Sequence, residues 1–157
     1  MSTRRNISNK FWIDVLTNQR YANETLLPNH VDKTRFQFWD SDLEHSCYYH
    51  LLKHLNGRQL IRQSETIILP PKYPFKKLSW NCDFELLGNN SKLIECKGAW
   101  IKHDNEALAN FVKILRFLSI FNPLDFERLI IVSDKRFTLI DTSIQVHSFN
   151  ELPDLLN

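Results

Sequence analysis

The sequence has few glycines, few cysteines and no long apolar run, and each shortage excludes a class of protein. Three glycines in 157 residues are too few for a loop-dominated or low-complexity chain. The three cysteines form no CxxC pair, which argues against a zinc ribbon or a disulfide framework and predicts reduced, packed thiols. No apolar run is long enough to span a bilayer, and the first ten residues lack the apolar core of a signal peptide. We therefore expect a cytoplasmic protein without a membrane partner.

The net charge is also small, at +2. This value permits a nucleic-acid partner but does not argue for one, and the basic residues are spread along the chain. A hydrophobic fraction of 43% predicts a folded core, and no internal repeat or clear linker is present. We expect one domain over residues 1–157, with an N-terminal arm or helix at 1–32, a core at 33–133 and a C-terminal extension at 134–157.

The most informative stretch is residues 80–100, WNCDFELLGNNSKLIECKGAW. Apolar and polar residues alternate before a Gly-Asn-Asn turn and again after it, which predicts two strands of a hairpin. Asp83 lies on the polar face of the first strand. Glu95 and Lys97, two positions apart in the second strand, point the same way. The hairpin therefore predicts that two acids and a lysine lie close together.

Two acids and a lysine are the residue types that a metal-dependent phosphodiesterase needs. Mg²⁺ prefers oxygen ligands, and Asp83 and Glu95 can supply two carboxylates, with the backbone carbonyl of Cys96 as a third ligand. Lys97 would place a cation beside the attacking water, either with a lowered pKa or as a charge that steadies the hydroxide and the phosphate. Mn²⁺ is expected to substitute for Mg²⁺. The alternative is a solvated face, since charged pairs on strands are usually exposed.

A helix from Asp42 to about Leu55 precedes the hairpin, and Glu44 lies in its first turn. Glu44 is a candidate for a further acid of the site, acting directly or through water. The alternative is that it only stabilises the N-terminus of the helix. Upstream, the spacing of Phe11, Trp12, Val15 and Leu16 predicts a short amphipathic helix. This arm packs on the domain or contacts DNA through Arg4 and Arg5.

The remaining segments complete the order α-β-β-β-α-β, a central mixed sheet flanked by helices. Strands are predicted at residues 33–39 and 128–133, and one or two strands at residues 60–69. The strand at 128–133 reads as buried on both faces. Asp104 caps a helix predicted from about Asn105 to Phe121, and Asn122-Pro123 ends it. Shorter strands are predicted at 137–141 and 144–147, and a short helix at 150–156.

These motifs resemble the PD-(D/E)xK nuclease superfamily, with Cys82-Asp83 and Glu95-Cys96-Lys97 as the motif and Cys82 in place of the usual proline. The resemblance covers residues 33–133 and implies a restriction-endonuclease-like core. Residues 95–100, with Asn122-Pro123 and the strand after it, are similar to phage endonuclease I-type junction resolvases. Residues 38–44 are similar to the transposon-end nuclease TnsA and to small phage or mobile-element nucleases. By this resemblance Glu44, Asp83, Glu95 and Lys97 carry over as the active site.

Other side chains are candidates for contacts with DNA. They are the exposed basic residues Lys72, Lys76, Lys77, His103, Lys113 and Arg116. Gln63 either points into the site or belongs to a polar strand face. Tyr73, Phe75 and Trp100 either wedge into DNA or pack on the protein. A zinc site on Cys47, His50 and His54 lacks a second ligand cluster.

We therefore expect a Mg²⁺-dependent DNA endonuclease from a mobile element or phage, acting in transposon-end cleavage, junction resolution or homing. Cutting both strands needs two active sites, so we expect a homodimer or a complex with a transposase or recombination partner. The rival is a catalytically silent module of the same fold that binds DNA or supports assembly. An RNA-directed nuclease is a third reading of the same residues.

Overall fold

The computed structural model describes residues 10–157, so Arg4 and Arg5 lie outside the described residues. The chain divides into two compact units between residues 46 and 47. The helix α1 (Asp42–Leu52) crosses this division. The prediction of a single domain over residues 1–157 stays a prediction.

The first unit contains a small antiparallel sheet in the order β2-β1-β3 (Arg20–Tyr21, Phe11–Asp14 and Phe36–Trp39). Two short 3-10 turns, η1 (Glu24–Leu26) and η2 (Lys33–Arg35), connect the strands. The side chains of Phe11, Ile13, Phe36 and Trp39 are buried and form its core. The carboxylate of Asp14, itself buried, accepts hydrogen bonds from Arg35 Nε and Nη2 at 2.7 and 2.5 Å. This ion pair lowers the pKa of Asp14.

The predicted helix at Phe11, Trp12, Val15 and Leu16 is wrong, because the segment is strand β1. Burial alternates at its start: Phe11 and Ile13 are buried, while Trp12 lies on the other face and packs on Phe38 with 5.2 Å between ring centroids. Cross-strand pairs of this kind stabilise aromatic and β-branched side chains more than a helix does when its apolar stripe has no partner to pack against. The predicted strand at 33–39 is correspondingly shorter, since residues 33–35 form η2.

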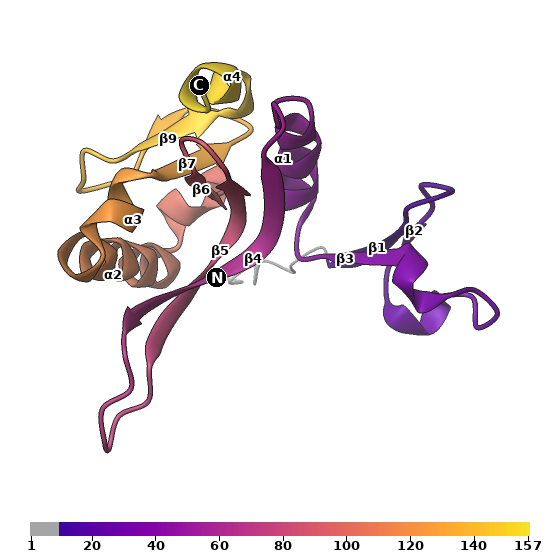
Figure 1. Ribbon diagram of the computed structural model, residues 1–157, viewed down its shortest axis with the longest axis horizontal. Helices are drawn as coiled ribbons and strands as arrows, with labels where there is room; N and C mark the ends of the chain where they lie inside the picture. Colours follow the sequence, from indigo (N-terminus) through magenta and orange to yellow (C-terminus); the bar gives the residue numbers. More distant parts are fainter. Residues whose placement is uncertain (1–9) are drawn as a thin grey trace. The chain divides into compact units, whose positions relative to one another are not determined.

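The second unit is built on a six-stranded mixed sheet in the order β4-β5-β6-β7-β9-β8, shown in Figure 1. The strands are β4 (Gln59–Leu69), β5 (Leu78–Leu87), β6 (Lys92–Cys96), β7 (Leu129–Ser133), β8 (Phe137–Thr138) and β9 (Gln145–Ser148). Strands β4, β5 and β6 are antiparallel, β6, β7 and β9 are parallel, and β8 returns antiparallel to β9. Strand β6 therefore lies in the interior of the sheet, paired on both edges.

The helices and short turns complete the second unit. They are α2 (Asn105–Phe121), α3 (Pro123–Glu127), α4 (Leu152–Leu155), η3 (Ala99–His103) and η4 (Phe149–Glu151). Among residues 10–157, the structure is thus mixed α/β, with four helices and a six-stranded mixed sheet. The element order α1-β4-β5-β6-α2-β7 follows the predicted α-β-β-β-α-β pattern, with α3 inserted before β7.

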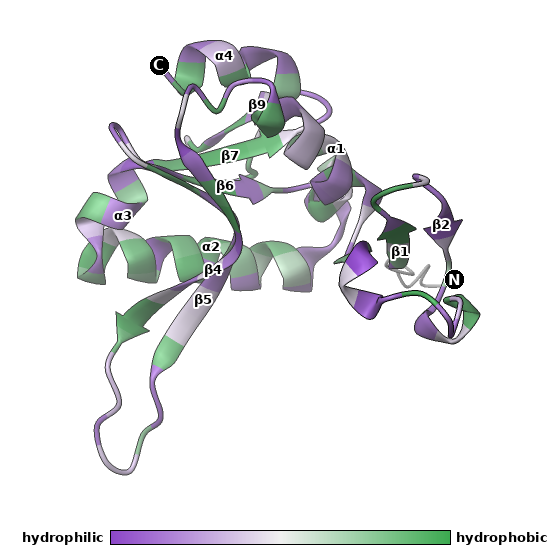
Figure 2. Cartoon of the chain, turned by 45° about the vertical axis from the view of Figure 1, so that its right-hand side comes forward, coloured by the Kyte–Doolittle hydropathy of each residue, from purple (hydrophilic) through white to green (hydrophobic). Residues whose placement is uncertain are grey.

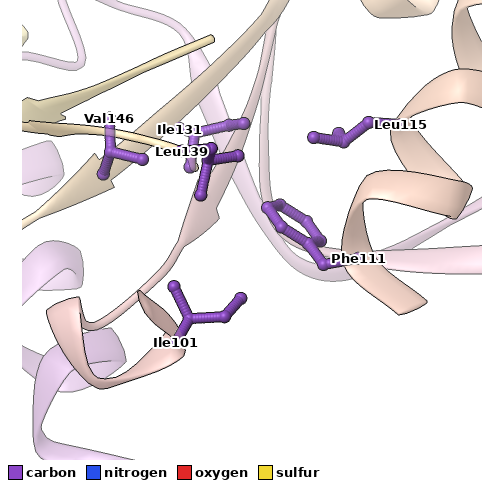
Figure 3. Packing of buried hydrophobic residues seen from close by; sticks show 6 residues of the cluster. All are labelled: Ile101, Phe111, Leu115, Ile131, Leu139 and Val146. Carbon is purple, nitrogen blue, oxygen red and sulfur yellow. The ribbon is translucent and has the colours of Figure 1, made fainter. Parts of the chain in front are cut away.

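A cluster of buried side chains packs η3 and α2 against β7 and the segments after it. Figure 3 shows Phe111 and Leu115 projecting from α2 toward Ile131, Leu139 and Val146. Figure 2 shows that α2 presents both apolar and polar residues along its length, as an amphipathic helix does. Within residues 10–157, no helix has both the length and the apolar character that crossing a membrane requires.

Candidate active site

The predicted hairpin forms and brings Asp83 and Glu95 together. Strands β5 and β6 pair antiparallel with Phe84 opposite Ile94. The next positions along this register are Asp83 and Glu95, and the amide of Asp83 donates to Glu95 Oε2 at 3.3 Å. Because β6 is an interior strand, Glu95 is only 3% exposed. The two carboxylates therefore lie side by side, one of them almost completely withdrawn from water.

The carboxylate of Asp83 is half-buried and held by the backbone of the neighbouring strand. The amide of Cys96 donates to Asp83 Oδ2 at 2.8 Å. On the other side, Gln63 Nε2 lies 3.5 Å from Asp83 Oδ1, a long and weak hydrogen bond. Of the two readings of Gln63 from the sequence, the structure thus places its side chain at the acid pair. Its backbone has a φ of 53°, in the left-handed region, although Gln63 lies within β4.

Lys97 closes the group from the end of β6. Its Nζ donates to Glu95 Oε1 at 2.5 Å and lies 4.6 Å from the centroid of the Phe111 ring. The backbone amide of Lys97 donates to the carbonyl of Val132 at 2.9 Å, which anchors the chain just beyond the strand. The Lys97 side chain is 23% exposed, whereas that of Glu95 is only 4% exposed. The contact between Lys97 and Phe111 was not predicted from the sequence.

The electrostatics of the group follow from burial and from the mutual repulsion of the acids. Burial and the neighbouring charge of Asp83 raise the pKa of Glu95 to about 7, although Lys97 acts in the opposite direction. For Lys97, burial alone would lower the pKa, but the charges of Glu95 and Asp83 outweigh it and the pKa is raised. The lysine is therefore held as an ammonium, and the glutamate is poised to lose or gain a proton near neutral pH.

The residues present fit a divalent cation of the Mg²⁺ type. No three His, Cys, Asp or Glu side chains within residues 10–157 are grouped to hold a metal by side chains alone. Mg²⁺ requires only one or two carboxylates, because it retains several waters, and Asp83 and Glu95 supply two. A cation beside them would also offset the repulsion that raises the pKa of Glu95. The amide of Cys96 contacts Asp83, and the ligand role of the Cys96 carbonyl stays a prediction.

Glu44 lies in the first turn of α1 and in the first of the two units. It is half-buried, and its amide donates to Ser41 Oγ at 3.2 Å, so the turn is capped by Ser41. The prediction that Glu44 adds a further acid to the site stays a prediction.

The basic side chains that were predicted to contact DNA all belong to the second unit, where they lie in three places. Lys72, Lys76 and Lys77 lie in the exposed connection between β4 and β5, where Lys77 Nζ pairs with Glu65 at 2.6 Å. Exposed side chains are also found at the end of η3 and along α2: His103, Lys113 and Arg116. Of the possible wedging residues, Tyr73 and Phe75 are 97% and 74% exposed, and Trp100 is 45% exposed.

Comparison of the chain with protein-family models, with curated proteins and with solved structures found no match.

Proposed function

We propose that this protein is a metal-dependent DNA endonuclease of the PD-(D/E)xK superfamily with a restriction-endonuclease-like core. The observation that carries the proposal is the position of Glu95, buried in an interior strand between the amide of Asp83 and the ammonium of Lys97. A second carboxylate beside a buried one destabilises both ionised forms, so an arrangement of this kind is expected where a cation is bound.

The net charge of the group supports the same conclusion. Asp83 and Glu95 contribute −2 when ionised and Lys97 contributes +1, which leaves the group negative. A phosphodiester, which carries one negative charge, would be repelled by this group on its own. A divalent cation reverses the sign and balances the charge of the acids, the lysine and one phosphate together. The acids and the lysine are thus suited to phosphodiester chemistry only in combination with a cation.

Asp83 and Glu95 would hold the Mg²⁺ or Mn²⁺ ion, which supplies charge neutralisation at the phosphate and makes water more acidic. Lys97 stays protonated because its pKa is raised, so it acts as a cationic hydrogen-bond donor to the phosphate or the nucleophile. The pKa favours this role over that of a general base. Phe111 and Glu95 fix the position of the ammonium, and Cys96 fixes Asp83 through its amide.

The direct test is cleavage of plasmid, linear duplex and branched DNA, with an RNA arm, in Mg²⁺ or Mn²⁺. Asp83→Asn and Lys97→Met should each reduce the cleavage rate by at least about a hundredfold, since each removes a charge at the reacting centre. Matched controls are Asp141→Asn and Lys135→Met, which alter exposed residues of the same type. Equal cleavage by the wild type and the Asp83 and Lys97 variants would show that the proposed site is wrong.

The source and the partners of the protein belong to the same proposal. A mobile element or phage, with transposon-end cleavage, junction resolution or homing as the pathway, remains our proposal for its origin. A homodimer or a complex with a transposase or recombination partner would supply the second active site for a double-strand cut. If the protein binds DNA but cleaves none of these substrates, either alone or with a partner protein, the catalytically silent DNA-binding module would be favoured.

A further inference from the structure

The connection between β4 and β5 is the most exposed aromatic segment of the second unit. Residues 70–77 read PPKYPFKK, with three lysines and no acid. The side chains of Tyr73 and Phe75 are 97% and 74% exposed. The turn is nevertheless ordered by its own backbone, because Lys72 and Phe75 exchange N–H···O bonds of 3.1 and 2.6 Å. Two aromatic rings and the ammonium groups of Lys72 and Lys76 are thus presented to solvent on a defined turn, while the ammonium of Lys77 pairs with Glu65.

The stem of this hairpin is continuous with the proposed active site. Strands β4 and β5 pair from Gln59 opposite Leu87 to Leu69 opposite Leu78, and Figure 1 shows their distal ends projecting from the rest of the second unit. Asp83 lies on β5, eight residues after Phe75. At about 3.4 Å per residue the tip lies roughly 27 Å from the acid pair, close to three quarters of a turn of duplex DNA. A DNA duplex of at least one turn that is engaged at the acids is therefore long enough to reach the tip.

The composition of the tip indicates which feature of DNA it recognises. Exposed lysines attract phosphates of any sequence, whereas aromatic rings gain little from a phosphate backbone. Rings stack on the faces of bases, and this contact requires bases that are unpaired or unstacked, since the faces are covered inside a duplex. Tyr73 and Phe75 add nothing to the core, so their apolar surface is available for such stacking. An anionic membrane is the rival partner, but it would not explain the continuity of the stem with the acid pair.

We propose that the β4–β5 tip binds DNA with accessible bases, such as a fork, a tail or a branch point, by stacking Tyr73 and Phe75 on them while Lys72 and Lys76 hold the flanking phosphates. This inference rests on the proposed nuclease function and names the class of DNA that the site acts on. The hairpin stem sets the spacing between the accessible bases and the bond that is cut.

The test is equilibrium binding by fluorescence anisotropy in EDTA, so that no cleavage occurs, with a continuous duplex and the same duplex carrying a fork. Tyr73→Ala/Phe75→Ala should weaken fork binding about ten- to a hundredfold and duplex binding less than about threefold. Lys72→Ala/Lys76→Ala should weaken binding to the forked DNA and to the continuous duplex by the same factor. Leu124→Ala and Lys135→Ala, which alter exposed residues outside the hairpin, should change neither. Tyr73→Trp/Phe75→Trp should restore fork preference.

An unchanged fork preference in Tyr73→Ala/Phe75→Ala would overturn the inference. The inference would also be overturned if this variant lost binding to anionic vesicles, relative to the wild type, while its binding to forked DNA stayed intact. The outcomes are separable from those of the nuclease test. A wild type that cleaves DNA, with the same fork preference after the aromatic substitutions, contradicts the hairpin inference alone. A wild type that binds forks through the aromatic tip but never cleaves contradicts the nuclease proposal alone.

Discussion

Substitution of Glu95 by glutamine should change how the stability of the protein depends on pH. The folded protein raises the pKa of Glu95 from its ordinary value of 4.5 to about 7. Between these values the unfolded chain releases the proton while the folded protein still retains it. Stability from the protonated carboxyl is therefore fully present below pH 4.5 and is lost as the pH rises through about 7. Glutamine carries no titrating proton, so Glu95→Gln should lack this loss.

The size of the effect follows from the shift. One pKa unit corresponds to 1.36 kcal/mol, so the free energy of unfolding of Glu95→Gln should rise relative to the wild type by roughly 3 kcal/mol between pH 4.5 and pH 8. Lys97 adds no slope in this window, because its pKa is raised and it stays charged. Carboxyls with lowered pKa values, such as those of Glu85 and Glu151, contribute stability that is lost as the pH falls from their unfolded pKa. Their contributions are common to both proteins and cancel in the difference.

The measurement is urea unfolding of both proteins at several pH values between 4.5 and 8, in EDTA. Glu106→Gln, which alters an exposed glutamate at the start of α2, is the matched control and should follow the wild-type curve. A constant difference between Glu95→Gln and the wild type across this range would refute the reasoning, because it would mean that Glu95 is ionised in the folded protein as easily as in the unfolded chain. A difference of opposite slope would mean that Lys97 stabilises the ionised form more than burial opposes it.

Two further predictions concern the same strands. If the proposed site binds Mn²⁺, the ion competes with the proton of Glu95, so its affinity should be on the order of tenfold weaker at pH 6 than at pH 8. The affinity is measured from the electron paramagnetic resonance signal of the free ion, and Asp83→Asn should abolish binding. An affinity independent of pH would contradict the raised pKa of Glu95. Burial raises the pKa of the Cys82 and Cys96 thiols, so neither should react with a thiol reagent at pH 8 until urea unfolds the protein, as counted by mass spectrometry. Rapid labelling of the native protein would show that these strands open.

The parts of the fold that the sequence predicts well are those with complete local signals. The helix α2 begins at Asn105 and ends at Phe121, as expected, because both ends are marked by side chains. Asp104 accepts a hydrogen bond from the amide of Ala107 at 2.9 Å, and Asn122-Pro123 stops the helix. The β5–β6 hairpin was likewise predicted, since alternation on both sides of a Gly-Asn-Asn turn allows few other pairings.

Features that depend on partners far along the chain were not predictable in this way. The segment at Phe11 has apolar spacing that suits a helix, and only pairing with β3 makes it a strand. The raised pKa of Glu95 depends on its burial, which in turn depends on the parallel strand β7 closing the other edge of β6. Gln63 was recognised as polar, but its approach to Asp83 follows from strand pairing together with an unusual backbone φ of 53°.

The arrangement of the charges of Asp83, Glu95 and Lys97 is difficult to explain by stability alone. A buried ion pair between Glu95 and Lys97 contributes little to stability, because the cost of removing both charges from water offsets their attraction. Asp83 makes the arrangement worse, since its charge raises the pKa of the buried glutamate further. A structural ion pair has no use for this second acid, whereas a cation site gains a ligand from it. If Asp83→Asn raises stability while it abolishes Mn²⁺ binding, the repulsion between the acids is retained for binding at the expense of folding.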